Sequence, residues 1–600
     1  MPFMKHLRRL LPYYTPYRSE LVTGLALVVG SMAITSVIPW IIRLAIDDIG
    51  ADAPASAVWK LAGDLVAVAV FSGFFRFAMR EIINSTSRRI EFDLRNDLFR
   101  HLTSLDAAWY GRNRTGDIMA RLTNDLSAVR MAAGPAVMYA TNTVFGAVFA
   151  IAFMLHIDRI LTLLAILPMI ALPVITVYLG GAIHRRFQSV QENFASLTTH
   201  AQENLTGTRI VRAYRQESAE IARFAILNDE YMARNMSLAK LYGTMHPLFG
   251  LLAGMAAVIV LGLGGSLVLK GTISVGAFVA FGIYLNFLTW PLIAFGWVIN
   301  LFQRGSASMA RLSEILDAKP SLEQASDPVH LAPVVGGRAI EFRNVGFHFP
   351  SSDDREPRWV LRNVSFTVPA GTTLGIVGST GSGKTALIDL IPRLYDPQEG
   401  EVFIDGVPLK SIPVDELRRE IGFVPQESLL FSDTIGANLG YGANDLSAVM
   451  WASETAQLSE TIESFPGSYE TVLGERGINL SGGQKQRASL ARALARQPAI
   501  VLLDDALSAV DTHTEAEILR ALREALTART AVIASHRVSA IRDATWIIVL
   551  DEGRVVEQGR HEQLMMAEGR YWTLLRRQQL VESIEGTDEQ GLALQGADSD

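Results

Sequence analysis

The sequence predicts a multidomain chain: a six-helix all-α transmembrane domain followed by a soluble α/β domain. Three observations support this. The chain has 600 residues, too many for one core. It is 49% hydrophobic and only 19% charged, against roughly 25% charged in soluble chains, so part of it faces lipid. Long apolar runs fill the first 303 positions, and short strand-like runs alternate with helical segments after position 337.

Six apolar runs of roughly 20 residues are each long enough to cross about 30 Å of hydrocarbon. The second run is the weakest because it carries Asp64 and Arg76. Buried helices of soluble proteins are seldom apolar all round over five turns, so we favour membrane spans. The expected spans are 21–42, 59–79, 131–155, 160–183, 241–269 and 275–302.

The distribution of arginine predicts the orientation in the membrane. Residues 1–18 lack the apolar core of a signal peptide and contain two prolines, so we expect an interfacial elbow there. The loops after spans 2 and 4 are rich in arginine, which places them in the cytoplasm. Because six is even, the N-terminus and the second domain lie on that same side.

Composition also excludes some functions. The net charge is -7, so the chain lacks the excess of positive charge that is typical of nucleic-acid binding, and we expect no nucleic-acid partner. The absence of cysteine excludes disulfides, thiolate metal sites and cysteine nucleophiles.

Proline and glycine mark the domain boundaries. A polar stretch at 317–337 predicts a linker between a transmembrane domain at 19–316 and a second domain at 338–578. Strand-like runs at 373–377 and 500–503 predict a buried parallel sheet in the second domain. Residues 579–600 are acidic and poor in large apolar side chains, which predicts a disordered tail.

A phosphate loop follows the first of these strands and precedes an apolar helix that begins near Thr385. Its backbone amides and the helix N-terminus would cradle phosphates, Lys384 would reach the β- and γ-phosphates, and Thr385 would ligate Mg²⁺. ATP and Mg²⁺ are therefore the expected ligands. The loop consists of Gly378, Ser379, Thr380, Gly381, Ser382, Gly383, Lys384 and Thr385.

About a hundred residues later stands a Leu-Ser-Gly-Gly-Gln pentapeptide that resembles the signature of the ATP-binding cassette (ABC) family. In that family two nucleotide domains face each other, and each signature caps the ATP held by the opposite phosphate loop. The resemblance therefore implies that the chain is half of a dimeric machine. Its capping residues would be Ser481, Gly482, Gly483 and Gln484.

Further motifs follow in the family's order. Asp504 ends an apolar run that resembles Walker B and would hold Mg²⁺. Gln426 resembles the Q-loop glutamine, which contacts Mg²⁺ and the coupling helices. Asp511 resembles the D-loop aspartate, and His536, after a strand at 531–534, resembles the switch histidine that senses the γ-phosphate.

Other resemblances point to an exporter of the multidrug or lipid type. Phe349 stands where relatives stack an aromatic ring on adenine, although a core position is the alternative. The segment 471–477 resembles the exporter X-loop, with Glu475 as a contact to the coupling helices. Segments 109–117 and 210–217 resemble the two intracellular loops that carry coupling helices, although ordinary amphipathic helices would look similar.

One position departs from the family. The residue after Walker B is usually a glutamate that polarises the attacking water, and here it is Asp505. A carboxylate misplaced by about 1 Å can lower the rate roughly a hundredfold. We therefore expect a low-activity site in a heterodimer whose other subunit carries glutamate. Retention of His536 leaves a fully active homodimer open.

The expected activity is ATP-driven export across a membrane, by an ATPase coupled to transport and integral to a bacterial inner membrane. A mostly apolar lining suits hydrophobic or amphipathic drugs, lipids or peptides. Alternatives are an ATP-gated channel or regulator on the same scaffold, and a soluble cassette ATPase, which six spans oppose. Polar or aromatic span residues that could line a cavity, or merely bond between helices, are Arg76, Asn142, Asn286, Trp290, Trp297 and Asn300.

Overall fold

The computed structural model describes residues 4–580 except 324, 351–357, 444, 475–476 and 478. Glu475 and residues 581–600 of the predicted tail lie outside the described residues, and residues 579 and 580 are helical. The chain forms two compact units, one of residues 1–103 and 115–318, the other of residues 104–114 and 319–600. The short segment 104–114 therefore belongs to the second unit, although both of its flanks belong to the first.

The first unit is entirely helical, as predicted. Within the described residues it contains six helical stretches that are long and apolar enough to span a membrane. The most apolar part of the stretch that starts at Ala55 has the smallest buried share of the six, 6%, and this stretch contains the span predicted to be weakest. The helices of six residues or more are α3 (Arg18–Gly50), α4 (Ala55–Ser104), α6 (Thr115–Ala120), α7 (Leu126–Ala133), α8 (Pro135–Ile157), α9 (Arg159–Met169), α10 (Ala171–Thr206), α11 (Thr208–Ala213), α12 (Glu217–Ile259) and α14 (Val275–Asp317).

Short elements complete the first unit. The predicted elbow consists of short helical turns, α1 (Met4–Leu7), η1 (Arg8–Leu10), α2 (Leu11–Tyr14) and η2 (Thr15–Tyr17). The π-helical turns η3 (Arg121–Asp125) and η4 (Val260–Gly264) interrupt the third and fifth stretches, and α13 (Gly265–Leu269) ends the fifth. All six stretches continue beyond the predicted spans because their polar ends also favour helix.

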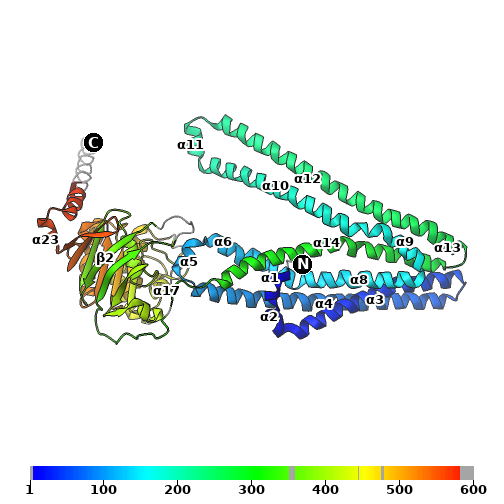
Figure 1. Cartoon of the computed structure of the whole chain (residues 1–600), viewed down its shortest axis with the longest axis horizontal. Coiled ribbons are helices and arrows are strands. Elements are labelled where there is room, and N and C mark those ends of the chain that lie inside the picture. Colours follow the sequence, from blue (N-terminus) through cyan, green and yellow to red (C-terminus); the bar gives the residue numbers. More distant parts are fainter. Residues whose placement is uncertain are drawn as a thin grey trace. The chain divides into compact units, whose positions relative to one another are not determined.

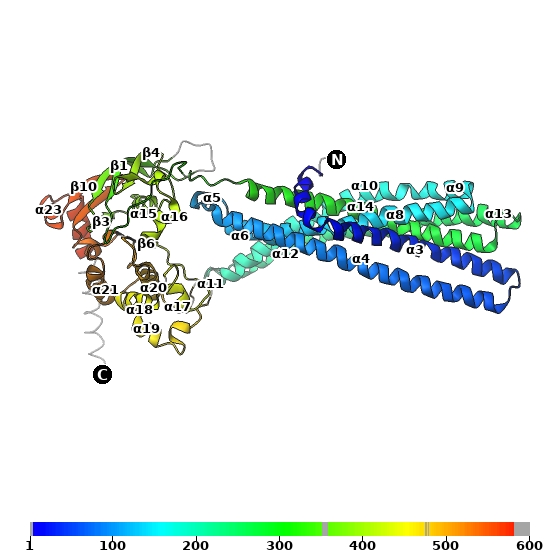
Figure 2. The ribbon, with the colours of Figure 1, turned by 90° about the horizontal axis from the view of Figure 1, so that it is seen from below.

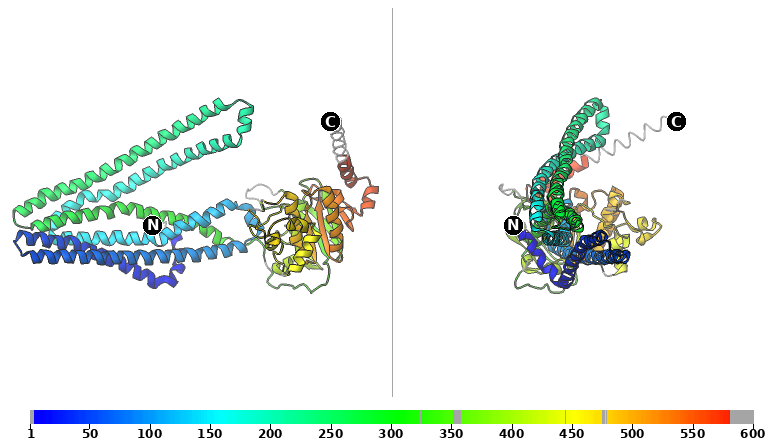
Figure 3. Two further views of the ribbon diagram at one scale, coloured as in Figure 1. Left: turned by 180° about the vertical axis from the view of Figure 1, so that it is seen from behind. Right: turned by 90° about the vertical axis from the view of Figure 1, so that its right-hand side faces the viewer.

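Small residues allow α14 to pack closely in the first unit. A Cβ atom on Gly276 would lie 2.2 Å from the carbonyl oxygen of Arg43, and one on Gly305 would lie 2.2 Å from the Cβ atom of Ala132. Small side chains are the usual means of close helix approach in membranes. The hairpin of α10, α11 and α12 diverges from α3, α4 and α8 of the same unit (Figures 1 and 3).

The described residues of the second unit form two sheets, and only one of them was predicted. The predicted parallel sheet has the order β10-β9-β3-β8-β7-β6, with β10 antiparallel at its edge. An antiparallel sheet, β2-β1-β4-β5, accompanies it. The strands are β1 (Ile340–Phe347), β2 (Leu361–Val368), β3 (Thr373–Gly378), β4 (Glu399–Ile404), β5 (Val407–Pro408), β6 (Ile421–Val424), β7 (Ile500–Asp504), β8 (Thr530–Ser535), β9 (Trp546–Asp551) and β10 (Arg554–Gly559).

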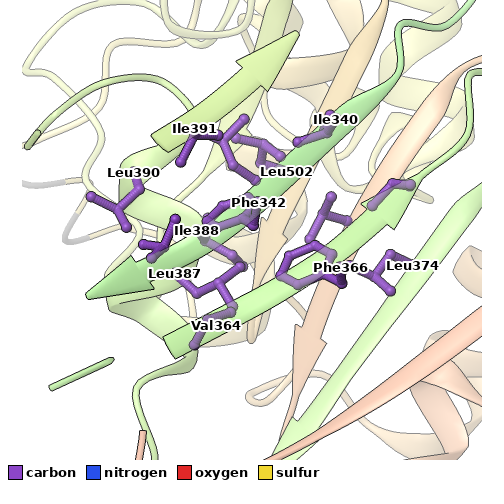
Figure 4. Packing of buried hydrophobic residues seen from close by; sticks show 14 of the residues in the cluster. Ile340, Phe342, Val364, Phe366, Leu374, Leu387, Ile388, Leu390, Ile391 and Leu502 are labelled. Atoms are coloured by element: carbon purple, nitrogen blue, oxygen red, sulfur yellow. The ribbon is translucent and has the colours of Figure 1, made fainter. Parts of the chain in front are cut away.

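Helices surround these strands, as Figure 2 shows for α15 to α21. One core lies between the antiparallel sheet and α15, where the rings of Phe342 and Phe366 stack 4.6 Å apart (Figure 4). The helices of the second unit are α5 (Ala107–Arg112), α15 (Lys384–Leu390), α16 (Val414–Arg419), α17 (Ile435–Leu439), α18 (Leu446–Thr455), α19 (Ser459–Glu463), α20 (Gly482–Ala495), α21 (Thr512–Ala525), α22 (Val538–Ile541) and α23 (His561–Met566), with short 3₁₀ turns at η5 (Leu409–Ser411) and η6 (Ser468–Glu470).

Candidate active site

The predicted phosphate loop connects β3 to α15. Two of its glycines have left-handed backbones, with φ of +81° at Gly381 and +103° at Gly383. A Cβ atom on Gly383 would lie 2.8 Å from a methyl carbon of Leu361, so both conformation and space require glycine there. The buried hydroxyl of Ser382 has no hydrogen-bond partner among the described residues. The loop therefore already has the shape of a phosphate-binding loop, and the Ser382 hydroxyl is available to a ligand.

The lysine of this loop is folded back onto the loop itself. Its Nζ donates to the carbonyl oxygens of Gly378, at 2.9 Å, and Ser379, at 3.0 Å. Burial lowers the pKa of Lys384, and the carboxylates of Asp505 and then Asp504 oppose that shift. The ammonium group is therefore held beside the predicted phosphate position. To bind a phosphate it has to give up only two hydrogen bonds to neutral carbonyl oxygens.

Strand β7 delivers two consecutive carboxylates to the same place. Asp504 is 2% exposed, and burial raises its pKa, while a hydrogen bond from the Thr385 side chain is the strongest opposing effect. Asp505 follows in a left-handed conformation, φ +49°, and its N–H donates to the carbonyl oxygen of Ala534 at 2.9 Å. The turn aims the second carboxylate away from the strand axis, toward the segment after β8.

His536 meets both Asp505 and the lysine. Its N–H donates to Oδ1 of Asp505 at 3.4 Å, and its Nε2 lies 3.8 Å from Oδ2. Its Nδ1 lies 3.3 Å from Nζ of Lys384. The structure thus brings together the phosphate-loop lysine, the Asp505 carboxylate and the predicted switch histidine. Lys384 and His536 are 152 positions apart in the sequence.

The signature residues begin α20. Ser481 is the N-cap: its hydroxyl accepts from the Gln484 N–H at 3.3 Å, and the Gln484 side chain accepts from the Ser481 N–H at 2.9 Å. This capping box leaves the helix N-terminus exposed, an arrangement suited to an anion. Within the described part of the chain, no hydrogen bond joins residues 481–484 to the phosphate loop.

The remaining predicted residues are exposed. Asp511 caps α21 through the Thr514 N–H at 2.9 Å, and this backbone hydrogen bond lowers the pKa of Asp511. Gln426 lies on the surface just after β6. Phe349 is 43% exposed and meets Phe347 and Tyr395 only edge-on, so it is not a core residue. Its free face suits stacking.

Sequence reasoning missed three residues of this region. Gln486 bonds Ser508 at 2.9 Å and the Ala509 N–H at 2.8 Å, which ties the signature helix to the loop before Asp511. The Gln578 amide donates to the carbonyl oxygen of His536. Burial and then the Asp504 carboxylate raise the pKa of Asp389 to about 7. Only contact geometry reveals them, since glutamine and aspartate at these spacings form no local pattern.

The first predicted coupling segment contains α5, which packs within the second unit. Ala108 lines a cavity of about 310 Å³ together with Leu322, Phe347 and Tyr395. The second predicted coupling segment contains α11, which belongs to the first unit.

Asp106 fastens α5 to the segment that follows α14. Its carboxylate caps α5 by accepting from the Trp109 N–H at 3.0 Å. It also accepts from the N–H and hydroxyl of Ser321, the latter at 2.5 Å, and from the Leu322 N–H at 3.2 Å. One carboxylate, 9% exposed, therefore joins segment 104–114 to the segment that begins at residue 319. At each of these segments the chain passes from the first unit into the second.

Comparison with known proteins places this geometry in a family. The family model of the ABC transporter transmembrane region matches residues 21–292, and a second one, described as "ABC transporter", matches residues 361–508. The chain is 39% identical over 82% of its length to a probable multidrug resistance ABC transporter ATP-binding/permease protein, YheI, of Bacillus subtilis, covering 84% of that protein. The chain belongs to the ABC transporter family.

Other ABC relatives cover more of the chain. The multidrug resistance-like ATP-binding protein MdlA of Escherichia coli is 35% identical, with 89% of each chain covered. An ATP-dependent lipid A-core flippase of Syntrophus aciditrophicus is 33% identical over 94% of this chain and 93% of its own length. The solved structure of a bacterial Atm1-family ABC exporter with ATP bound has 28% identity and a TM-score of 0.74, covering 94% of this chain and 98% of that one. This ABC protein is therefore an exporter-type ATPase coupled to transport across a membrane.

We expect Asp106→Ser to separate transport from ATP hydrolysis in this exporter. Serine is a good N-cap and keeps α5 intact, but its shorter side chain loses the hydrogen bonds to Ser321 and Leu322. Hydrogen bonds to a charged group are worth about 1.5–3 kcal/mol, so transport per ATP hydrolysed should fall roughly tenfold. Parallel measurement of both rates checks this, and Ser321→Ala, which removes one bond, should give a smaller loss. An unchanged ratio would remove the coupling role of Asp106.

Proposed function

We propose that this chain is one half of a dimeric exporter in which ATP lies between the phosphate loop of one subunit and the signature of the other. The observation that carries the proposal is the division of the site. The chain holds a complete phosphate cradle and a complete exposed signature cap, and no hydrogen bond among the described residues joins the two. Each half needs a complement from a companion subunit.

The roles of the residues follow from their positions. Loop amides from Ser379 to Lys384 and the N-terminus of α15 bind phosphate oxygens. The Lys384 ammonium exchanges its carbonyl partners for the β- and γ-phosphates. Phe349 stacks on adenine. The companion's signature then presents its serine, glycines and helix N-terminus to the γ-phosphate.

The residues also fit Mg²⁺. Thr385 and Asp504 already share a hydrogen bond, and hydroxyl and carboxylate oxygens are the ligands that Mg²⁺ accepts. Gln426, exposed after β6, is the third candidate ligand. When bound, the ion neutralises phosphate charge. Among the described residues no group of three His, Cys, Asp or Glu side chains is arranged to hold a metal ion by itself, so phosphates and water would complete the coordination.

We infer that the site built on this phosphate loop is slow. Asp505 is one methylene shorter than the usual glutamate, and its carboxylate is already engaged by His536. A base displaced by about 1 Å can lose roughly a hundredfold in rate. The intact signature serves the other site, so the favoured assembly is a heterodimer whose partner carries glutamate. The retained His536 supports the homodimer as the alternative.

The transported molecules are hydrophobic or amphipathic drugs, lipids or peptides. Four of the predicted lining residues recur at spacings of 4, 7 and 3 on α14, so they share one helix face: Asn286, Trp290, Trp297 and Asn300. All four are exposed in the first unit, and aromatic faces beside amides suit molecules with apolar and polar parts. The drug and lipid names of the relatives support the same class.

The protein resides in a bacterial inner membrane with its N-terminus and nucleotide domain in the cytoplasm. The arginines in the C-terminal half of α4 and in the region from the middle of α10 to α12 support this orientation, and the named relatives are bacterial.

Vesicle transport tests the proposal. Inside-out vesicles that contain the assembled transporter should accumulate an amphipathic dye against its gradient only when ATP is supplied, and Lys384→Ala should abolish this accumulation. Dissipation of a preformed dye gradient, without accumulation, would instead establish a channel.

A further inference from the structure

A cavity of the first unit lies between the elbow and α4. Its volume is about 600 Å³, and its lining includes Tyr17, Asn84, Ser85, Arg88 and Asp93. The cavity is separate from the predicted ATP site and from the exposed face of α14. Its lining combines guanidinium, amide, hydroxyl and carboxylate groups with the aromatic rings of Tyr17 and Phe92.

The packing of α3 against α4 gives the depth of this cavity in the membrane. The two helices are antiparallel neighbours: the hydroxyls of Thr35 and Ser72 lie 2.7 Å apart, and a Cβ atom on Gly24 would lie 2.7 Å from Ile83. Glu20 reaches Thr86 at 3.1 Å. The apolar run of α3 begins at the next residue, Leu21, so the hydrocarbon ends at about the level of Thr86.

The apolar run of α4 gives a similar boundary. Its exposed phenylalanines within the apolar run are Phe71, Phe74 and Phe77, and Arg80 follows. The exposed Phe92 and Phe99 come later, among charged residues. With a rise of about 1.5 Å per residue, the boundaries on the two helices differ by roughly 10 Å. The cavity lining begins between them and continues toward the cytoplasm. The cavity therefore occupies the head-group layer, directly below a surface that contacts acyl chains.

Besides Glu81, two charged groups in the lining remain available. Arg89 is already paired with Glu20 at 2.7 Å, and the Tyr17 hydroxyl donates to Oδ2 of Asp93 at 2.9 Å. Arg88 is exposed and forms no hydrogen bond or ion pair with another described residue, and Oδ1 of Asp93 accepts none from the described residues. A free guanidinium and a half-used carboxylate thus face the same cavity.

The order of these two charges matches one class of head group. Side chains of a helix tilt toward its N-terminus, so Arg88 reaches back toward the hydrocarbon, to the level of Asn84 and Ser85. Asp93 stands more than one turn further into the cytoplasm. A phospholipid has its phosphate next to the glycerol and its amine further out. Phosphate at Arg88 and ammonium at Asp93 follow that sequence.

We propose that this cavity binds the head group of a zwitterionic aminophospholipid of the bilayer, of the phosphatidylethanolamine type. Arg88, Asn84 and Ser85 donate hydrogen bonds to the phosphate, and the free oxygen of Asp93 accepts from the primary ammonium. Glu81, which also lines the cavity, adds a second negative charge and disfavours acidic head groups. A quaternary ammonium has no N–H to donate to Asp93, so phosphatidylcholine binds less well.

Native mass spectrometry of the assembled transporter in detergent tests this proposal through titration with single phospholipids. For the wild type we expect the first phosphatidylethanolamine to bind at least fivefold more tightly than phosphatidylglycerol or phosphatidylcholine. Arg88→Gln should weaken phosphatidylethanolamine binding about tenfold, the order expected for a charge-assisted hydrogen bond. Asp93→Asn, which can still accept from Tyr17, should remove the preference over phosphatidylcholine.

Arg100→Gln is the matched control. Arg100 is an exposed arginine on the same helix, three turns further into the cytoplasm and paired with Asp97 at 3.2 Å, and its replacement should leave lipid binding unchanged. An unchanged melting temperature and ATPase rate establish that the variants are folded. Tighter binding of phosphatidylglycerol, no selective binding of any lipid, or equal effects of Arg88→Gln and Arg100→Gln would each overturn the proposal.

Discussion

Replacement of Ser481 by arginine should reduce ATP turnover by the assembled transporter at least about a hundredfold. Ser481 caps α20 through a reciprocal bond pair with Gln484, and its loss costs the helix about 1 kcal/mol. The larger effect is on the companion's site. The arginine side chain fills the space in front of the helix N-terminus, so the two nucleotide domains cannot close on the γ-phosphate. Steady-state ATPase measurements on the purified assembly check this.

Ser447→Arg provides the matched control for that substitution. Ser447 is also an exposed serine in the first turn of a helix of the second unit, α18, where it bonds Asp445. It is no part of the signature, so turnover should stay within about twofold of the wild type, the range of a surface substitution. Equal losses in the two variants would mean that arginine damages folding rather than the cap.

Asp505→Glu should increase ATP hydrolysis at the site built on this chain's phosphate loop, by tenfold or more. The added methylene extends the carboxylate by about one C–C bond, and catalytic groups misplaced by about 1 Å can lose roughly a hundredfold in rate. The measurement is single-site turnover in an assembly whose other site has been inactivated. The backbone at this position is left-handed, φ +49°, a conformation that aspartate adopts more readily than glutamate, so the melting temperature of the variant is measured beside its rate.

Asp505→Asn is the companion variant. It keeps the size of the side chain but removes its charge, so it should lower whatever hydrolysis the native site supports. Brisk turnover by the wild-type chain alone, with no gain from Asp505→Glu, would contradict the slow site and favour an active homodimer.

Much of the architecture follows from local sequence patterns. The six apolar stretches and the parallel strands β3 and β7 are strong signals because membrane thickness and sheet burial act on consecutive residues. The phosphate loop can also be predicted from local sequence. Its glycines are required by left-handed backbone conformations within a few positions, such as the φ of +103° at Gly383.

The antiparallel sheet and the contacts between distant segments could not be predicted in the same way. Strand β1 pairs with β4 about 60 positions later, and its buried residues include Phe342, whose partner Phe366 lies in another strand. The bonds of Asp106 to Ser321 connect positions 215 residues apart. Such pairings depend on the final fold. The unpaired Arg88 in the head-group cavity could not be predicted either. The structure had to show first that the neighbouring Arg89 pairs with Glu20.

Cross-linking between subunits tests the central claim most directly, because this chain contains no cysteine to interfere. Ser379, in the phosphate loop, and Ser481, in the signature, are both exposed. The measurement pairs Ser379→Cys on one chain with a cysteine at the signature serine of its companion, which is Ser481→Cys if the companion is a second copy. The expected result is a covalent dimer whose yield rises sharply when ATP is added. No dimer with ATP, or a link that forms within a single chain, would contradict a nucleotide shared by two subunits.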